Sequence, residues 1–398
     1  MSLVFFEGFN HSDSDNIKLD PNYWTIENGT SSYVTQSSSA RTNTAIVLTG
    51  RGYSTPLSSN TVLSLSNFTD PLASKNGFGI GFYTHSTYSL STNRTDGSSS
   101  PHNENLIAFY DNTNTEVLRI DIIATTFNGS GSMGFAIYQN STLVDYYDIK
   151  SFFGYSWTVS TYNSFYYLSN NNYFELFVDS KNNNQLSIRL TANNTYEAPL
   201  LNNSSNSIYT SITGFNSLSK IRFYGTHNNR LYDDLYLTSG DSISEALLGY
   251  NTRIYKLVPF SDGATNEWYN NAGNATANNS YINGTIDGDS GYIVSNTSGN
   301  TSLFQFDDLP SGYPTGIGGI KINNVLRKTS ITNDTVFTNV IASGDGTGLT
   351  NIGSQHTINS TTYSYKNSFV FTNPMTGNSF TPYDINNMQI GVKNLGNV

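Results

Sequence analysis

The sequence predicts a nearly all-β fold of two antiparallel β-sandwich, jelly-roll-like domains with few short helices. Aromatic residues make up 14% of the chain, with 28 Tyr and 23 Phe, whereas Met, a good helix former, occurs only 4 times. Many segments alternate between apolar and polar residues, which indicates strands with one buried face. Clusters of Asn, Ser and Gly separate these segments about every dozen residues, a spacing typical of sandwiches and not of doubly wound sheets.

The clearest hairpin lies in the first half of the chain. Apolar and polar residues alternate along 173–179, so Glu175 and Asp179 are expected on the outer face of a strand. The polar residues 181–184 supply the turn, and a second alternating strand follows at 186–190. Further strands of this half are expected at 77–83, 105–110, 118–123, 132–138, 220–224 and 234–237.

A short capped helix marks the expected boundary between the domains. Residues 242–245 have the pattern of a capping box, and Gly249 can end the turn in the left-handed conformation. We therefore expect one domain over residues 1–240 and a smaller β-sandwich over residues 245–398.

The second domain is expected to begin with a strand at 251–259, followed by a loop rich in Asn and Gly at 262–286. A capped turn at 381–384, with Pro382 at the first helical position, leads into the last strand. The remaining strands are expected at 292–294, 302–306, 319–326, 335–341, 363–371 and 388–392.

The composition excludes several classes of function. The net charge is −10 and only 12% of residues are charged, so we expect no broad attraction to nucleic acid or to an anionic membrane. The chain has no cysteine, which excludes disulfides and thiolate metal sites. Its first residues carry no basic segment and only a short apolar run, so neither an export signal nor membrane insertion is expected.

No catalytic constellation is recognisable, and we expect no enzyme activity. The histidines are scattered, without the spacing of a metal site or a triad. A glycosidase needs two carboxylates about 5 to 10 Å apart, and Glu175 and Asp179 form a single pair with no partner cluster nearby.

The adjacent pair Asp233 and Asp234 is the metal candidate, with calcium as the one cofactor left open. Calcium takes several carboxylate and carbonyl oxygens, and so short a run supplies too few ligands by itself. The favoured interpretation is that an aspartate hydrogen-bonds backbone amides where the next strand begins.

A group of aromatic residues is the candidate ligand-binding site. Tyr162, Tyr166 and Tyr167 follow Trp157 in a region otherwise full of Ser and Asn. This composition is typical of adaptable binding surfaces, in which exposed rings contact sugars or protein partners.

Motifs along almost the whole chain resemble those of tailed-bacteriophage virion structural proteins. The first half resembles a concanavalin A-like (laminin-G-like) sandwich, through the sequences at 5–9, 23–24, 79–82 and 233–237. The second half resembles a C-terminal module of phage structural proteins, through the sequences at 248–254, 257–259, 262–268, 287–292, 327–328, 373–377 and 390–392.

The resemblance implies a virion protein assembled in the cytoplasm of a bacterial host, either a capsid decoration protein or head fibre, or a tail component. Its partners would be other capsid or tail proteins and a host surface glycan, and a homo-oligomer would be plausible. The C-terminal module would serve for attachment or oligomerisation, and no catalytic residue is implied. Two alternatives stay open: a capsule polysaccharide depolymerase and a bacterial surface lectin.

Overall fold

The chain is built from antiparallel β-sheets, as predicted. Among the residues that the computed structural model describes, the helices have at most six residues, and none is long and apolar enough to cross a membrane. The chain folds into two compact units, one ending at Ile254 and the other beginning at Tyr255. The described residues are 2–9, 19–28, 34–37, 45–48, 61–86, 102–127, 130–148, 172–191, 208–225, 230–249, 252–282, 291–311, 316–329 and 332–398.

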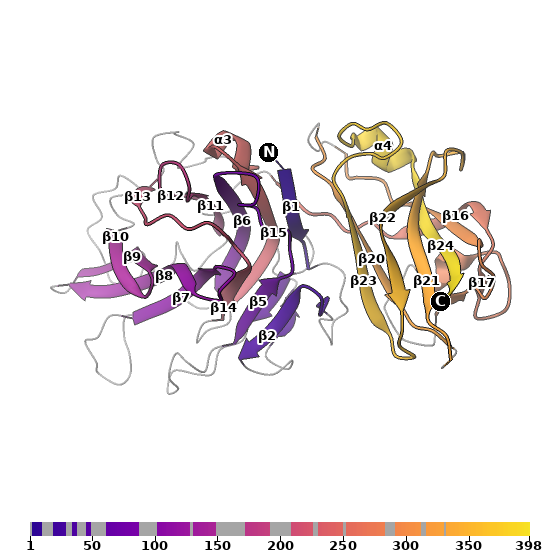
Figure 1. Cartoon of the computed structure of the whole chain (residues 1–398), viewed down its shortest axis with the longest axis horizontal. Helices are drawn as coiled ribbons and strands as arrows, with labels where there is room; N and C mark the ends of the chain where they lie inside the picture. The colour runs from indigo at the N-terminus through magenta and orange to yellow at the C-terminus, as the bar shows by residue number, and fades with distance from the viewer. Residues whose placement is uncertain are drawn as a thin grey trace. The chain divides into compact units, whose positions relative to one another are not determined.

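The first unit is a sandwich of two antiparallel sheets (Figure 1). One sheet has the order β13 (Ile208–Ser211), β12 (Gln185–Thr191), β11 (Asn172–Asp179), β6 (Gly77–Ser86), β15 (Arg230–Gly240), β4 (Ala45–Leu48) and β3 (Val34–Ser37), and β1 (Ser2–Glu7) also pairs with β15. The other has the order β10 (Thr142–Asp148), β9 (Ser130–Gln139), β8 (Glu116–Phe127), β7 (His102–Tyr110), β14 (Lys220–Tyr224), β5 (Val62–Ser66) and β2 (Trp24–Asn28).

Aromatic side chains fill the space between these two sheets. Phe78 of β6 meets Phe109 of β7 with ring centroids 5.4 Å apart, and Phe174 of β11 meets Phe135 of β9 at 5.6 Å. All four rings are buried. Each pair joins one sheet to the other, so burial of apolar surface holds the sandwich closed.

The predicted hairpin is confirmed with its register. Strands β11 and β12 pair Leu176 with Ile188 and Val178 with Leu186, as the alternation requires. The expected exposure of Glu175 and Asp179 is wrong, because both carboxylates are buried. Each is covered by groups that hydrogen-bond it, so β11 is buried on both faces.

Helix α3 (Ile243–Ala246) follows β15 at the predicted place. The Ser242 hydroxyl accepts a hydrogen bond from the Glu245 amide, and Gly249 has a φ of 90°, in the left-handed region. The Glu245 carboxylate accepts from the amide of Asp241 at 3.0 Å, one residue before the expected partner. The predicted N-cap is therefore confirmed, but the reciprocal bond of the predicted capping box is not formed.

The second unit contains a larger sheet with the order β16 (Pro259–Asn266), β19 (Thr301–Phe306), β24 (Gln389–Asn397), β21 (Thr335–Ala342) and β22 (Thr350–Ile358). Two short sheets accompany it, β20 (Ile320–Leu326) with β23 (Ser364–Val370), and β17 (Tyr269–Asn270) with β18 (Ile293–Val294). A 3₁₀ turn, η3, spans Asn278–Tyr281. Residues Ile341, Val370, Phe380 and Ile390 form a buried cluster that joins the β20–β23 pair to the larger sheet.

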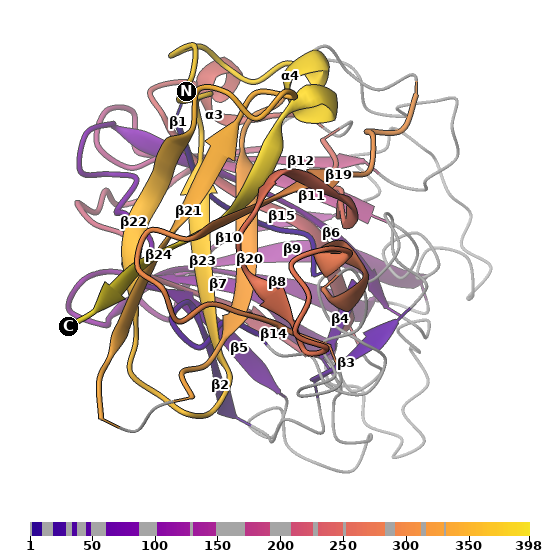
Figure 2. The same ribbon diagram turned by 90° about the vertical axis from the view of Figure 1, so that its right-hand side faces the viewer.

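Helix α4 (Pro382–Asn387) leads into β24, as predicted (Figure 2). Its capping box is complete: the Thr381 hydroxyl accepts from the Asp384 amide, and the Asp384 carboxylate accepts from the Thr381 amide at 2.8 Å. The buried Ile385 anchors the helix in the core of the unit.

Two expectations for the second unit are wrong. Residues 252–258 form no strand, because their amides find partners other than a neighbouring strand, such as the Asp234 carboxylate for Ile254. The strand β16 begins instead at Pro259 and extends into the expected loop. The strand β22 was not predicted, because its large apolar residues, Ile352 and Ile358, are separated by a run of Gly and polar residues.

Candidate functional site

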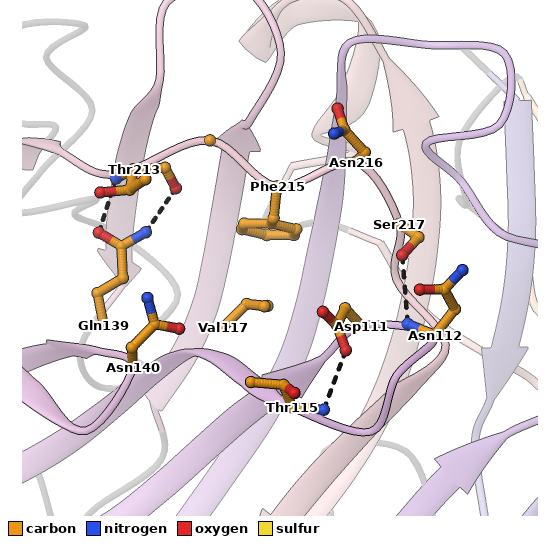
Figure 3. Close-up of a pocket in the computed structure, with 11 residues that line it drawn as sticks. Asp111, Asn112, Thr115, Val117, Gln139, Asn140, Thr213, Phe215, Asn216 and Ser217 are labelled. Carbon is orange, nitrogen blue, oxygen red and sulfur yellow. Dashed lines mark hydrogen bonds between the residues drawn. The ribbon is translucent and has the colours of Figure 1, made fainter.

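A pocket of about 370 Å³ lies in the first unit, where three turns meet (Figure 3). This volume is within the range of sites that bind small molecules, which is about 300–1,000 Å³. The turns are those between β7 and β8, between β9 and β10, and between β13 and β14. The pocket is lined by Asp111, Asn112, Thr115, Val117, Gln139, Asn140, Thr213, Gly214, Phe215, Asn216 and Ser217.

The β7–β8 turn is held by Asp111. Its Oδ1 accepts hydrogen bonds from the backbone amides of Thr113 and Thr115, each at 2.9 Å, which is the pattern of an Asx turn. Partial burial alone would raise the pKa of Asp111, but the hydrogen bonds from Thr113 and Thr115 hold it below its ordinary value. The side chain is therefore an ionised carboxylate at neutral pH.

The β9–β10 turn is a tight two-residue hairpin turn. Asn140 and Ser141 both have positive φ, 47° and 65°, as a type I′ turn requires. The preceding Gln139 fixes the third turn, since its amide donates to the Thr213 carbonyl at 2.5 Å and accepts from the Thr213 amide at 2.6 Å. One buried side chain thus ties two walls of the pocket together.

The loop from β13 to β14 is anchored at further points. The Ser180 hydroxyl donates to the carbonyl of Phe215 at 2.8 Å, and the amide of Asn112 donates to the Ser217 hydroxyl at 3.2 Å. The Phe215 ring packs against Phe78 of the core, with centroids 6.3 Å apart. The pocket is therefore preformed by these contacts, and none of them involves the side-chain amides of Asn112, Asn140 and Asn216.

The polar groups that face the pocket are largely without partners. Within the described residues, no hydrogen bond engages the side-chain amides of Asn112, Asn140 and Asn216, or the Oδ2 atom of Asp111. In Figure 3, Val117 lies below the ring of Phe215, Asn140 and Asp111 lie on either side below it, and Asn216 and Asn112 lie on the rim above and to the right. Three amides and one carboxylate oxygen are available to a ligand that has hydroxyl groups.

The aromatic residues predicted from the sequence to bind a ligand, Trp157, Tyr162, Tyr166 and Tyr167, lie outside the described residues. Their role stays a prediction. None of them is among the described residues of the pocket.

The predicted metal pair is buried inside a strand. Asp233 and Asp234 are both fully buried in β15, which begins at Arg230, so the expected strand start at Asp234 is wrong. The strand continues through the pair because a bulge there, with Asp234 at a φ of 47°, takes up the irregularity.

Both aspartates accept hydrogen bonds from backbone amides, which is the part of the favoured interpretation that the structure confirms. Asp233 Oδ1 accepts from the amide of Asp234 at 2.8 Å, and Asp234 Oδ1 accepts from the amide of Ile254 at 2.9 Å. No group of three or more potential metal-ligating side chains occurs in the part of the chain that the structure describes. Calcium binding at this pair stays a hypothesis.

Sequence reasoning missed the pocket, because its walls come from three turns that are far apart in the chain. The available signal was local. The run Asp111-Asn112-Thr113-Asn114-Thr115 is typical of an Asx turn between two strands, and Asn140-Ser141 separates two others. Neither pattern indicates that the two turns meet.

No protein-family model and no curated protein matches the sequence. Among solved structures, similar ones include the Bacteroides ovatus xyloglucan-locus protein GH43B (9% identity, TM-score 0.32, 60% of this chain and 40% of that one). Others are an endo-1,3-β-glucanase from Streptomyces sioyaensis (11%, TM-score 0.33, 60% and 97%) and a lectin from Bauhinia forficata with GalNAc (10%, TM-score 0.32, 60% and 99%). The chain thus spans less than half of the first protein. At these identities and TM-scores, what the three proteins bind or cleave says nothing about this chain.

Proposed function

We propose that the first unit binds a glycan in the pocket formed by the three turns. The observation that carries the proposal is the set of unpartnered groups, the amides of Asn112, Asn140 and Asn216 and one oxygen of Asp111, around the apolar Phe215 and Val117. A sugar offers hydroxyl groups that match amides in both directions, and a C–H face that packs on apolar side chains. Preformed walls reduce the entropy lost on binding.

The same lining supports binding without cleavage. Hydrolysis of a glycosidic bond needs two carboxyl groups that flank it. Asp111 is the only acidic residue among the described residues of the pocket. We therefore propose a binding protein rather than a depolymerase.

Removal of the three side-chain amides should weaken sugar binding. In the variant with Asn112 and Asn216 changed to Ala and Asn140 changed to Gly, which accepts the positive φ of this position, three lost hydrogen bonds of about 0.5–1.5 kcal/mol each should weaken binding at least about tenfold. The measurement is a glycan array probed with the purified chain, followed by titration of each sugar that gives a signal.

The matched control is Asn378→Ala, an exposed asparagine of the second unit. It should bind every sugar as the wild type does. If the wild type binds no sugar on the array, or if the triple variant binds as well as the wild type, the proposed site is wrong.

We further propose that the chain displays this binding unit on a phage particle, with the second unit used for attachment or oligomerisation. The support is the ordered set of motifs from 248 to 392 that resembles a module of phage structural proteins. Display in many copies would suit a small sugar site, because weak individual affinities gain from multivalency. The bacterial surface lectin stays the alternative to particle display.

Purified virions should therefore contain the chain in fixed stoichiometry to the major capsid protein. Quantitative mass spectrometry measures that ratio. Hundreds of copies would indicate capsid decoration, and a few to some tens would indicate a tail or fibre component. Absence from virions would contradict particle display while leaving sugar binding by the purified chain unaffected.

A further inference from the structure

We infer that the pocket selects uncharged or amine-bearing sugars and rejects sugars that carry a carboxylate. This inference rests on the proposed glycan-binding function and names the class of its ligand. It follows from the charge of the pocket and from the way in which the neighbouring charges are paired.

The described lining of the pocket has a single charge, and it is negative. Asp111 is its only ionisable residue, and the other polar side chains are amides and hydroxyls. In Figure 3 the carboxylate lies at the mouth of the β7–β8 turn, with one oxygen bound to the Thr115 amide and the other directed toward the Phe215 side of the pocket. A ligand in the pocket would therefore meet a fixed carboxylate oxygen.

The cations on the adjoining strands are already engaged with other groups. Lys220 contacts the side-chain oxygen of Asn114 and lies 3.3 Å from the Glu27 carboxylate, which also pairs with Arg222. On β8, Arg119 forms ion pairs with Glu116 at 2.8 Å and with Asp121 at 3.0 Å. Among the residues that the structure describes, no Lys or Arg forms an ion pair with Asp111, whose hydrogen-bond donors come from Thr113 and Thr115.

An unpaired carboxylate oxygen discriminates by both attraction and repulsion. It accepts a hydrogen bond from a hydroxyl, an acetamido N–H or an ammonium group, and the bond is stronger when the donor is charged. A sugar carboxylate in the same space would place two like charges within a few ångströms of each other, and they would repel. Hydrogen bonds within the turn lower the pKa of Asp111, so the repulsion persists at mildly acidic pH.

The variant Asp111→Asn separates the charge from the structure of the turn. An asparagine Oδ1 can accept from the amides of Thr113 and Thr115 as the aspartate does, so the Asx turn is retained. The test uses matched conjugates of glucose and glucuronate, galactose and galacturonate, and mannose and mannuronate. Affinities are measured for the full chain by biolayer interferometry.

The wild type should bind the neutral member of at least one pair about tenfold or more tightly than the acidic member. Asp111→Asn should reduce that ratio to less than about threefold. Asn140→Asp, which adds a second carboxylate at a position that already has positive φ, should increase the ratio. This second variant keeps the test decisive if Asp111→Asn disturbs the turn.

Two results would overturn the inference while the proposed function stands: equal or tighter binding of an acidic sugar by the wild type, or an unchanged ratio in both variants. No binding of any neutral or acidic conjugate, together with a blank glycan array, would overturn the proposed function and the inference with it.

Discussion

Replacement of Gly391 by alanine should destabilise the second unit by about 3 kcal/mol or more, enough to unfold it in many conditions. An added Cβ would lie 1.8 Å from the backbone carbonyl oxygen of Ser302. Because that atom belongs to the main chain of β19, no rotation of a side chain can relieve the clash. Gly391 lies in β24, the central strand of the sheet, which pairs with β19 on one side and β21 on the other. The strands would have to separate, at the cost of hydrogen bonds and core packing.

Hydrogen exchange of the amides in 335–342 measures the stability of this sheet separately from the first unit. The matched control is Gly316→Ala, also in the second unit, where the added Cβ meets nothing within 4 Å and the φ is not positive. The control should exchange like the wild type. If Gly391→Ala also exchanges like the wild type, β24 and β19 do not approach each other as closely as the clash requires.

Strands with clear alternation could be predicted well from the sequence. The strand Lys220–Tyr224 was predicted with its observed bounds, because the apolar Ile221 and Phe223 alternate with side chains that end in a polar group. Within β11, the direction of the apolar face was also right. Local periodicity carries this information, because successive side chains of a strand point to opposite faces.

Features that depend on distant segments could not be predicted. The burial of Glu175 results from Tyr236 and Gly249, which lie on other parts of the chain. Strand β22 forms because β21 offers it a partner at the sheet edge, although most of its side chains are exposed. In both cases, tertiary contacts outweigh the local pattern.

The pocket shows the same limit for function. Each of its three turns could be recognised in the sequence as a turn, from Asn, Asp, Ser and Gly residues. Their meeting depends on the order of strands in two sheets and on the double hydrogen bond between Gln139 and Thr213. The sequence favoured instead an aromatic group, because numerous aromatic residues near Ser and Asn are a compositional signal that needs no knowledge of contacts.

The removal of one hydroxyl in Tyr236→Phe should destabilise the first unit by about 3 kcal/mol. The hydroxyl, which is buried, donates to Glu175 Oε1 at 2.5 Å and accepts from the Leu248 amide at 3.0 Å. Glu175 also accepts from the Gly249 amide at 2.6 Å. The Tyr236 hydroxyl and the Glu175 carboxylate together therefore join β11, β15 and the segment after α3. The phenylalanine leaves the Leu248 amide without that partner and the buried carboxylate with one donor fewer, which costs more than the bond itself contributes.

The pH dependence of the stability lost in Tyr236→Phe tests whether the buried hydroxyl is responsible for it. Burial, together with the nearby Tyr173 and Glu175, raises the pKa of Tyr236 well above its ordinary value of 10.0. The stability that the hydroxyl contributes is therefore fully present below pH 10 and decreases as the pH rises further, because the unfolded tyrosine ionises first. The difference in free energy of unfolding between wild type and Tyr236→Phe, measured by hydrogen exchange of 77–86, should shrink by about 1.4 kcal/mol per pH unit above 10.

The matched control is Tyr146→Phe, which changes an exposed tyrosine of the same unit and should alter the stability little at any pH. Equal effects of the two substitutions would mean that the Tyr236 hydroxyl does not hold these segments together.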